Sequence, residues 1–541
     1  MKDSKNTRVE SGSQSLGRRA VMKLGLGLSA AVGGLLNARM SSAQADGTAT
    51  RAGGQVPGFK FRPQAWTEEE RYAGVKMQTG PGWTNNSNRS YGNGPMDDTS
   101  RMIVEYVNSF SESNINDAWV SAFNNTMIDT IASLISGFES DSARVCARLA
   151  RSTRSDLNST VLGYGISTSP ELAAYANTTM IRFTDFNDHF SDMMGGVLAV
   201  GEALHSTGTQ AMLAVILAYQ IQSALSSAGG NDAGLDIGLY YAPAVAVAAG
   251  KLLGLNEDQL ANALSLALTL HVPLRVDRSN TLSMQKACGT AEAVRIAVFC
   301  ALSAREGMTG PARPFEGRDG LWDRLTGPYT RLRLPPPAPV TTGLSAAIKR
   351  RPAEGYTQAM HADVIPEIRA WTKAEDIESI HVEMPFSGWL EIADPPKWDP
   401  RNHETADHSM AYEASRALID GDVYLDSFTN EKFLDPAARA LMNKITVSVD
   451  PDFGYGQVRM TVRKKSGDLL TKETNSRSGF NFGPPMSHDD IVAKYHRVCD
   501  FMHVESEQRD HALTQWSELS AVKDLAEPMK TLAKFGKPRP L

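Results

Sequence analysis

Residues 185–192, with the sequence DFNDHFSD, bring three carboxylates, an amide, an imidazole and a hydroxyl into one short segment. Carboxylates and imidazoles often transfer protons at neutral pH, so this segment is the first candidate for acid–base chemistry. The candidate side chains are Asp185, Asn187, Asp188, His189 and Ser191. Residues 195–217 form an apolar run that predicts a buried helix, whose N-terminal end favours anions because its first N–H groups are unpaired. The alternative is an acidic loop that only caps this helix, with Ser191 or Asp192 as N-cap.

Two groups of cations could bind the carboxylates of a substrate. Lys286 precedes a predicted helix at residues 290–304, where its charge opposes the helix dipole unless an anion lies nearby. Lys349 and Arg350 belong to a second basic run that follows a proline-rich segment. The alternatives are a surface lysine in the first case and a solvated charge run in the second.

A third polar segment, residues 404–412, has the pattern of a helix N-terminus. Thr405 or Asp407 is the expected cap, and His408 lies one helical turn before Tyr412. These side chains could contact a substrate, although a buried tyrosine commonly only donates a hydrogen bond to a neighbouring group.

Several chemistries have no support in the sequence. It contains no phosphate-binding GxxxxGK[ST], no HExxH and no GxSxG, and His488 and His496 are too far apart for a metal pair on one helical face. Four scattered cysteines without a CxxC pair predict small core residues rather than zinc or iron–sulfur ligands. The net charge of −6 gives no reason to expect nucleic acid as a partner. We therefore expect an acid–base site for a small anionic metabolite, with no metal and no cofactor.

The elements around these residues predict a mainly α fold. From residue 111 the apolar positions follow helical spacing, and 198–225 and 242–253 are apolar over most of their surface, which is typical of buried helices. A proline-rich boundary follows at 334–339. Residues 377–384 and 444–449 alternate like strands, and 458–474 predict a hairpin with a Ser-Gly turn. The predicted fold is a large all-helical domain plus a smaller α+β lid domain.

The N-terminal segment predicts an export signal. Arg18 and Arg19 precede a moderately apolar run at 24–36, and small residues at 43–45 form a plausible cleavage site. We expect a twin-arginine signal peptide, a periplasmic location, and no membrane anchor once the signal is removed. No other stretch is expected to span a membrane. The predicted organisation is 1–45 signal peptide, 46–110 irregular leader and start of the helical domain, 111–335 helical domain, 336–476 α+β lid domain, and 477–541 C-terminal helices returning to the helical domain.

From about Asn125 to Tyr495 the sequence resembles the MmgE/PrpD family, which contains 2-methylcitrate dehydratases, cis-aconitate decarboxylases and iminodisuccinate epimerases. The resemblance is carried by a series of motifs in order: DFND at 185–188, HFSD with two glycines at 189–196, AAGKLLGL at 248–255, SMQK at 283–286, GMTGP at 307–311, FEG at 315–317, KRRPAE at 349–354 and HSMAY at 408–412. In this chain His189 follows Asp188 directly, and Phe190 stands where the family usually has proline.

The resemblance implies a homodimer with an all-helical domain and an α+β lid, and it implies roles for residues. Those implied to be catalytic are Asp185, His189, Lys286, Lys349 and Tyr412, with Asp185 and His189 transferring protons. Those implied to bind substrate are Asn187, Asp188, Ser191, Arg350, Glu354 and His408; glutamate at 354 is the dehydratase-like form. The expected function is a cofactor-independent dehydratase of a 2-methylcitrate-type di- or tricarboxylate. A decarboxylase, an epimerase or an exported carboxylate-binding protein are the alternatives.

Overall fold

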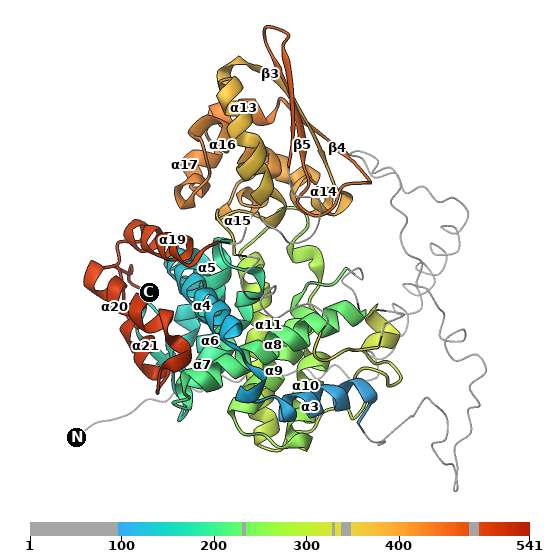
Figure 1. Cartoon of the computed structure of the whole chain (residues 1–541), viewed down its shortest axis with the longest axis vertical. Coiled ribbons are helices and arrows are strands. Elements are labelled where there is room, and N and C mark those ends of the chain that lie inside the picture. Colours follow the sequence, from blue (N-terminus) through green and yellow to red (C-terminus); the bar gives the residue numbers. More distant parts are fainter. Residues whose placement is uncertain (1–95, 230–233, 327–330, 337–343, 345–347, 475–485) are drawn as a thin grey trace, which may run out of the picture. The chain divides into compact units, whose positions relative to one another are not determined.

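The computed structural model describes residues 96–229, 234–326, 331–336, 344, 348–474 and 486–541, apart from the side chains of His189, Asp323 and Thr326. The predicted signal peptide and residues 46–95 of the predicted leader segment lie outside the described residues. The described chain is mainly helical with few strands, and the predicted fold class is confirmed (Figure 1).

The larger domain is built from long helices. Their bounds are α3 (Asp98–Ser109), α4 (Asp117–Gly137), α5 (Asp141–Ala150), α6 (Pro170–Phe183), α7 (Met194–Ala203), α8 (Gly208–Gly229), α9 (Gly238–Leu252), α10 (Glu257–Leu270) and α11 (Gln285–Arg305). α11 packs against α6 and α9, and α9 packs against α8 and α10. Every residue of α9 from Gly238 to Gly250 is buried, because helices without a polar face need other helices on all sides.

Close helix contacts hold the ends of the acidic segment 185–192 in place. α6 leads into this segment, and α7 leaves it. A Cβ on Gly137 of α4 would lie 2.0 Å from the carbonyl oxygen of Met180 in α6, and one on Gly195 of α7 would lie 2.1 Å from Thr178 Oγ1. Only glycine permits these approaches, so α4 and α7 both fix the C-terminal part of α6.

Three features of the helical domain differ from the prediction. A two-stranded antiparallel hairpin, β1 (Ser159–Val161) with β2 (Ile166–Thr168), interrupts the helices. The apolar run after residue 195 forms two helices, α7 and α8, because the chain turns at His205, whose φ is 51°. Within the described residues, α8 and α11 are also long and apolar enough to cross a membrane, with 83% and 67% of their apolar windows buried. The prediction that no other stretch is long and apolar enough to span a membrane is therefore wrong. Buried core helices can have the same length and apolar composition as a membrane-spanning helix.

The smaller domain contains a four-stranded sheet with the order β4-β3-β5-β6. The strands are β3 (Ile377–Met384), β4 (Ile445–Val449), β5 (Arg459–Lys464) and β6 (Leu469–Glu473). β3 pairs with β4 in parallel and with β5 antiparallel, and β5 pairs antiparallel with β6. The predicted strands and hairpin are confirmed. Ile380, Val382 and Met460 point to the covered face, which agrees with the alternation that predicted β3.

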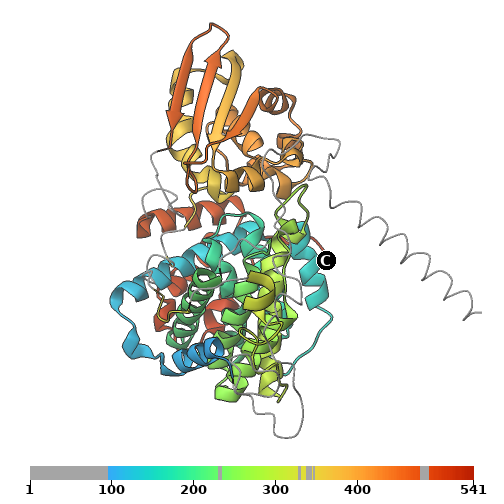
Figure 2. The same cartoon turned by 90° about the vertical axis from the view of Figure 1, so that its right-hand side faces the viewer.

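Helices cover this sheet and return the chain to the larger domain (Figure 2). In the smaller domain they are α13 (Ile365–Trp371), α14 (Phe386–Ile392), α15 (His403–Ala406), α16 (Met410–Asp420), α17 (Asn430–Phe433) and α18 (Pro436–Met442). The last helices are α19 (His488–Phe501), α20 (Ser506–Ser517) and α21 (Ala526–Thr531). α19 and α20 pack against α4 of the larger domain.

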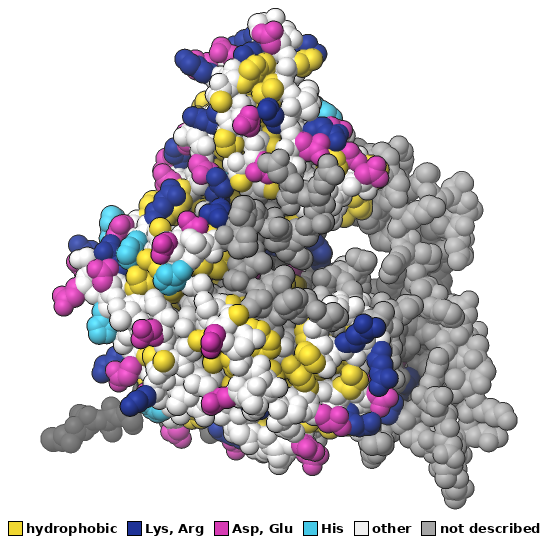
Figure 3. All heavy atoms as spheres, viewed as in Figure 1, with side chains coloured by type: hydrophobic (Ala, Val, Ile, Leu, Met, Phe, Trp, Pro, Cys, Tyr) yellow, Lys and Arg dark blue, Asp and Glu magenta, His cyan; other side chains and the backbone are white. Residues whose placement is uncertain are grey.

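The surface and the cysteines fit the composition. On the face drawn in Figure 3, acidic and basic side chains are interspersed among the coloured residues, without a broad area of one sign. All four cysteines are free thiols; Cys146, Cys300 and Cys499 are buried, and Cys288 is half-buried. The prediction of core residues is confirmed for the three buried thiols.

Candidate functional site

The acidic segment forms a turn whose first carboxylate binds cations from two parts of the chain. Asp185 has a φ of 52°, in the left-handed region that aspartate tolerates better than most residues. Its carboxylate lies 2.8 Å from the Arg182 guanidinium and 2.7 Å from Lys349 Nζ, and all three side chains are buried. Burial alone would raise the pKa of Asp185, but Arg182 and Lys349 together hold it well below its usual value. Asp185 is therefore an ionised carboxylate between two cations.

The remaining polar side chains of this turn mainly stabilise the turn itself. The Asn187 amide donates to Ser191 Oγ at 3.0 Å and to Asp192 Oδ1 at 2.8 Å, and Ser191 Oγ donates to the Asp188 carbonyl at 2.7 Å. The structure thus gives Asn187 and Ser191 partners within the turn, and their substrate contacts stay a prediction. The predicted N-caps are also wrong: Asp188 caps a short 3₁₀ helix, η2 (His189–Met193), and α7 has no side-chain cap.

Asp188 faces the interior of the helical domain. Tyr219 donates to its carboxylate at 2.9 Å, and its backbone N–H donates to Asp129 Oδ2 at 3.1 Å. Burial raises the pKa of Asp188 to about 7, which places it between the charged and neutral forms near neutral pH. His189 begins η2, but its side chain lies outside the described part of the structure, so its predicted role in proton transfer stays a prediction.

Lys286 lies in the first turn of α11, which begins five residues earlier than predicted. The anion expected beside Lys286 is a carboxylate of the protein itself. Asp407, from the smaller domain, forms a fully buried ion pair with Lys286 Nζ. Lys286 Nζ also donates to the Phe183 carbonyl at the end of α6, at 3.3 Å. The surface-lysine alternative is therefore wrong, and Lys286 joins the end of α6, just before the acidic turn, to the smaller domain.

The 404–412 segment contributes Asp407 and His408, but the predicted caps are wrong. Asn402 caps α15 and Ser409 caps α16, while Asp407 lies between the helices. The Asp407 carboxylate lies 3.0 Å from His408 Nδ1 and 3.5 Å from His403 Nε2. Burial would raise the pKa of Asp407, yet Lys286 and both histidines hold it well below its usual value. Burial, followed by the charge of Lys286, lowers the pKa of His408 to about 4, so this imidazole is neutral at pH 7.

Lys349, Arg350 and Glu354 have different surroundings. Lys349 is buried against Asp185, whereas Arg350 is a third exposed and lies 3.9 Å from Asp490 of α19. The charge-run alternative is thus wrong for Lys349. Glu354 is buried and accepts a hydrogen bond from the Tyr356 N–H at 2.6 Å. Burial, with the nearby charge of Glu391, raises the pKa of Glu354 to about 8, so it carries a proton at neutral pH.

Tyr412 does not take the expected position. Its hydroxyl donates to the carbonyl of Ser427, and its ring packs edge-on to Phe428 at 6.1 Å. This is the neighbour-bonded alternative that the sequence left open. The predicted role of Tyr412 as a donor to the reacting face stays a prediction.

Three charged residues of the site were missed or misjudged from the sequence. Arg182 precedes Asp185 by three residues, a spacing that alone could have suggested the pair. Asp407 was considered only as a helix cap. Lys494 of α19 was overlooked within a histidine-containing segment; its Nζ donates to Asp129 Oδ1 at 2.6 Å, to the Phe186 carbonyl at 2.6 Å and to the Lys349 carbonyl at 2.9 Å. Long-range partners of this kind leave no mark in the local sequence.

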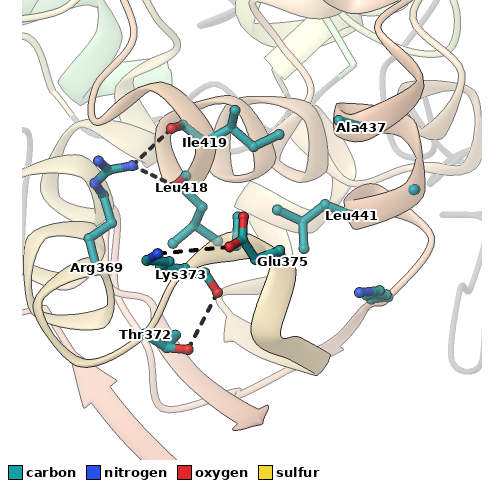
Figure 4. A pocket seen from close by; sticks show the side chains of 11 residues that line it. Arg369, Thr372, Lys373, Glu375, Leu418, Ile419, Ala437 and Leu441 are labelled. Carbon is teal, nitrogen blue, oxygen red and sulfur yellow. Dashed lines mark hydrogen bonds and ion pairs between the residues drawn. The ribbon is translucent and has the colours of Figure 1, made fainter. Parts of the chain in front are cut away.

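A separate surface pocket of about 490 Å³ lies on the smaller domain (Figure 4). It is lined by Arg369, Thr372, Lys373, Ala374, Glu375, Leu418, Ile419, Ala437, Ala440, Leu441 and Lys444. Arg369 donates to the carbonyls of Leu418 and Ile419, and Lys373 lies 3.9 Å from Glu375. The pocket includes none of the predicted site residues. Its position gives it no part in the buried cluster.

The buried cluster around Asp185 consists of three cations, Arg182, Lys286 and Lys349, and three carboxylates, Asp185, Asp192 and Asp407. The acid–base groups of the site also include the neutral imidazole of His408 and the protonated carboxyl group of Glu354. In the described part of the chain, no group of three or more His, Cys, Asp or Glu side chains is arranged to hold a metal ion.

The fold and site define a mainly α protein of two domains whose charged residues meet at their junction. Residues 101–331 match the MmgE/PrpD N-terminal domain, and residues 352–518 match the MmgE/PrpD C-terminal domain. The chain belongs to the MmgE/PrpD family, and the resemblance found in the sequence is confirmed.

Curated relatives carry two kinds of name. The chain is 28% identical to a 2-methylcitrate dehydratase of Salmonella typhi over 346 residues, which cover 59% of this chain and 71% of that protein. It is 28% identical to a 2-methylcitrate dehydratase of Cupriavidus necator over 381 residues, covering 64% and 77% respectively. It is 24% identical to a cis-aconitate decarboxylase of Homo sapiens over 421 residues, covering 72% and 85%. Dehydratases and decarboxylases are both lyases, so these relatives support a lyase function at the level of the family.

Proposed function

We propose that this protein is a cofactor-independent dehydratase of a small di- or tricarboxylate of the 2-methylcitrate type. The observation that carries the proposal is the junction at which Lys286 and Lys349, buried and 63 positions apart in the sequence, meet the acidic turn and Asp407. Burying a charged side chain is unfavourable for folding unless the charge is paired. A buried cluster of six charged side chains therefore requires either well-formed ion pairs or a functional role. Binding an anionic substrate is a use that matches the charges.

The chemistry of dehydration matches the side chains. A proton must leave a carbon next to a carboxylate, and a hydroxyl must leave the neighbouring carbon as water. A positioned base and a positioned acid each contribute about 10²–10⁴-fold to the rate. Lys286 and Lys349 would bind the substrate carboxylates and stabilise the negative charge that develops beside the reacting carbon, which is often the largest single contribution.

Glu354 can supply the acid that dehydration needs. A carboxyl group that keeps its proton up to a pH of about 8 can donate that proton to a leaving hydroxyl under physiological conditions. The proposed roles are therefore Glu354 as acid, Lys286 and Lys349 as carboxylate partners, and Asp185 as the group that orients Lys349.

The test is an ultraviolet absorbance assay of the purified protein with 2-methylcitrate, citrate, malate and tartrate, because dehydration creates a carbon–carbon double bond conjugated to a carboxylate. We expect absorbance to rise with at least one of them. Lys349→Met should lower the rate by at least 100-fold. Lys373→Met is the matched control, since Lys373 is an exposed lysine of the separate surface pocket, and it should keep the wild-type rate.

The other outcomes separate the alternatives. Release of carbon dioxide without water elimination would replace the dehydratase by a decarboxylase. Racemisation or inversion of a chiral substrate without elimination would indicate an epimerase. Thermal stabilisation by one carboxylate, with no turnover of any, would identify a binding protein on the same scaffold.

A further inference from the structure

One carboxylate in the cluster serves two functional groups at once. Asp407 forms the buried ion pair with Lys286 through Oδ2, while its Oδ1 lies 3.0 Å from His408 Nδ1. All three side chains are buried to within about one per cent of their surface. The arrangement is a lysine, an aspartate and a histidine in a row, fixed at the junction of α11 with the segment between α15 and α16.

The hydrogen bond to Asp407 determines which imidazole nitrogen carries the proton. An ionised carboxylate only accepts hydrogen bonds, so His408 Nδ1 must be the N–H donor. A neutral imidazole has one N–H, and Nε2 must therefore carry a lone pair. His408 Nε2 is buried and has no hydrogen-bond partner among the described residues. Nε2 is therefore a buried nitrogen whose lone pair accepts no hydrogen bond from the described residues and can accept a proton.

The charged and titratable groups around this imidazole come from four segments. Asp407 precedes it in the chain, and His403 of α15 approaches the same carboxylate. Lys286 approaches from α11, and the charge of Asp185 in the acidic turn also acts on His408. Asp185 in turn binds Lys349, the second predicted carboxylate partner. His408 thus lies beside the Lys286–Asp407 pair and near the acidic turn that binds Lys349.

We propose that His408 Nε2 is the base that removes the carbon-bound proton of the substrate, and that Asp407 is the residue that positions it. This inference rests on the proposed dehydratase function. In the step, the C–H bond breaks and its proton forms an N–H bond on Nε2. The electron pair of the C–H bond becomes the second bond of the new double bond, while the C–O bond breaks. The leaving hydroxide takes a proton from Glu354 and departs as water.

A bound substrate makes this base stronger. In the free protein, burial and Lys286 keep the pKa of His408 at about 4, which suits an unprotonated base but gives it little affinity for a proton. A di- or tricarboxylate beside Lys286 adds negative charge, which offsets the lysine and raises the pKa of the imidazole. The base therefore gains proton affinity only when a substrate is present.

The enzymatic test compares His408→Gln, Asp407→Asn and His381→Gln in the full-length protein. His408→Gln should lower kcat at least 100-fold, because it removes the base. Asp407→Asn should lower kcat at least tenfold, because the asparagine amide can donate to Nδ1 and shift the imidazole proton to Nε2. His381→Gln changes a histidine of β3 whose ring bonds to Thr446 and Ser448, and it should change kcat less than threefold. An active wild type together with a His408→Gln variant that keeps a third of its kcat would overturn the inference and leave the proposed function intact.

A second measurement needs no substrate. In protein labelled with ¹⁵N-histidine, long-range ¹H–¹⁵N spectra report which nitrogen of each of the 11 imidazoles carries a proton, and the His408 signals are those lost in His408→Gln. At pH 7 we expect a protonated Nδ1 and an unprotonated Nε2, and the reverse in Asp407→Asn. A protonated Nε2 in the wild type would refute the base, whatever the activity. If instead no carboxylate is turned over while the spectra agree, the proposed function fails and the tautomer assignment stands.

Discussion

Replacing Lys494 with methionine removes a buried ammonium that joins three segments. In the wild type this group pairs with Asp129, bonds to the carbonyls of Phe186 and Lys349, and lies 3.8 Å from the centre of the Phe186 ring. Methionine has a similar length but no donor, so two carbonyls lose this donor and the Asp129 carboxylate loses its cation, keeping the hydrogen bond from the Asp188 N–H. Removing one member of a buried ion pair typically costs about 3–5 kcal/mol of the free energy of unfolding. We expect a loss of that size for Lys494→Met.

Urea unfolding measures this loss, with two controls. Lys432→Met removes a lysine that pairs with Asp420 at the surface, where the expected cost is about 0–1 kcal/mol. The double variant Asp129→Asn/Lys494→Met removes both charges of the buried pair and should be more stable than Lys494→Met alone, since no unpaired carboxylate remains. A loss for Lys494→Met no larger than that for Lys432→Met would refute the view that this buried ammonium holds the acidic turn and the Lys349 segment together.

Three further predictions concern pH, assembly and export. The folded protein keeps the proton of Glu354 up to a pH of about 8, whereas the unfolded chain releases it near 4.5, so the stability of the fold should decrease as pH rises between these values. Glu354→Gln should reduce this dependence of stability on pH. Equal slopes for variant and wild type, measured by thermal unfolding at several pH values, would contradict the prediction. We expect the homodimer that the resemblance implies to cover the exposed apolar side chains of Leu274 and Val276. Changing both to aspartate should therefore halve the mass measured by light scattering, and an unchanged mass would exclude this surface. Changing Arg18 and Arg19 to lysine should retain the protein in the cytoplasm, and equal periplasmic amounts of variant and wild type would argue against the twin-arginine route.

The sequence was most informative where the signal is local. Alternation identified β3, and the hairpin of β5 and β6 followed from a Ser-Gly turn between two strand-like runs. The buried helices followed from runs without a polar face. The hairpin of β1 and β2 was missed because strands of three residues are too short to show a period.

The site was predicted only in part, for a physical reason. Lys286 and Asp185 could be named because a lysine in the first turn of a helix and a cluster of acids are unusual within a short window. The pairing of Lys286 with Asp407 and of Asp185 with Lys349 could not be predicted, since the partners lie 121 and 164 positions apart. The role of Tyr412 was inferred from the resemblance, and in the structure its hydroxyl donates a hydrogen bond to the Ser427 carbonyl.

A structure of the protein with bound 2-methylcitrate or citrate would show whether the two buried lysines bind the substrate. We expect carboxylate oxygens of the ligand about 2.7–3.2 Å from both Lys286 Nζ and Lys349 Nζ, with the reacting carbon facing His408 Nε2. A ligand in the surface pocket beside Lys373, with both buried lysines still paired only to Asp407 and Asp185, would contradict it.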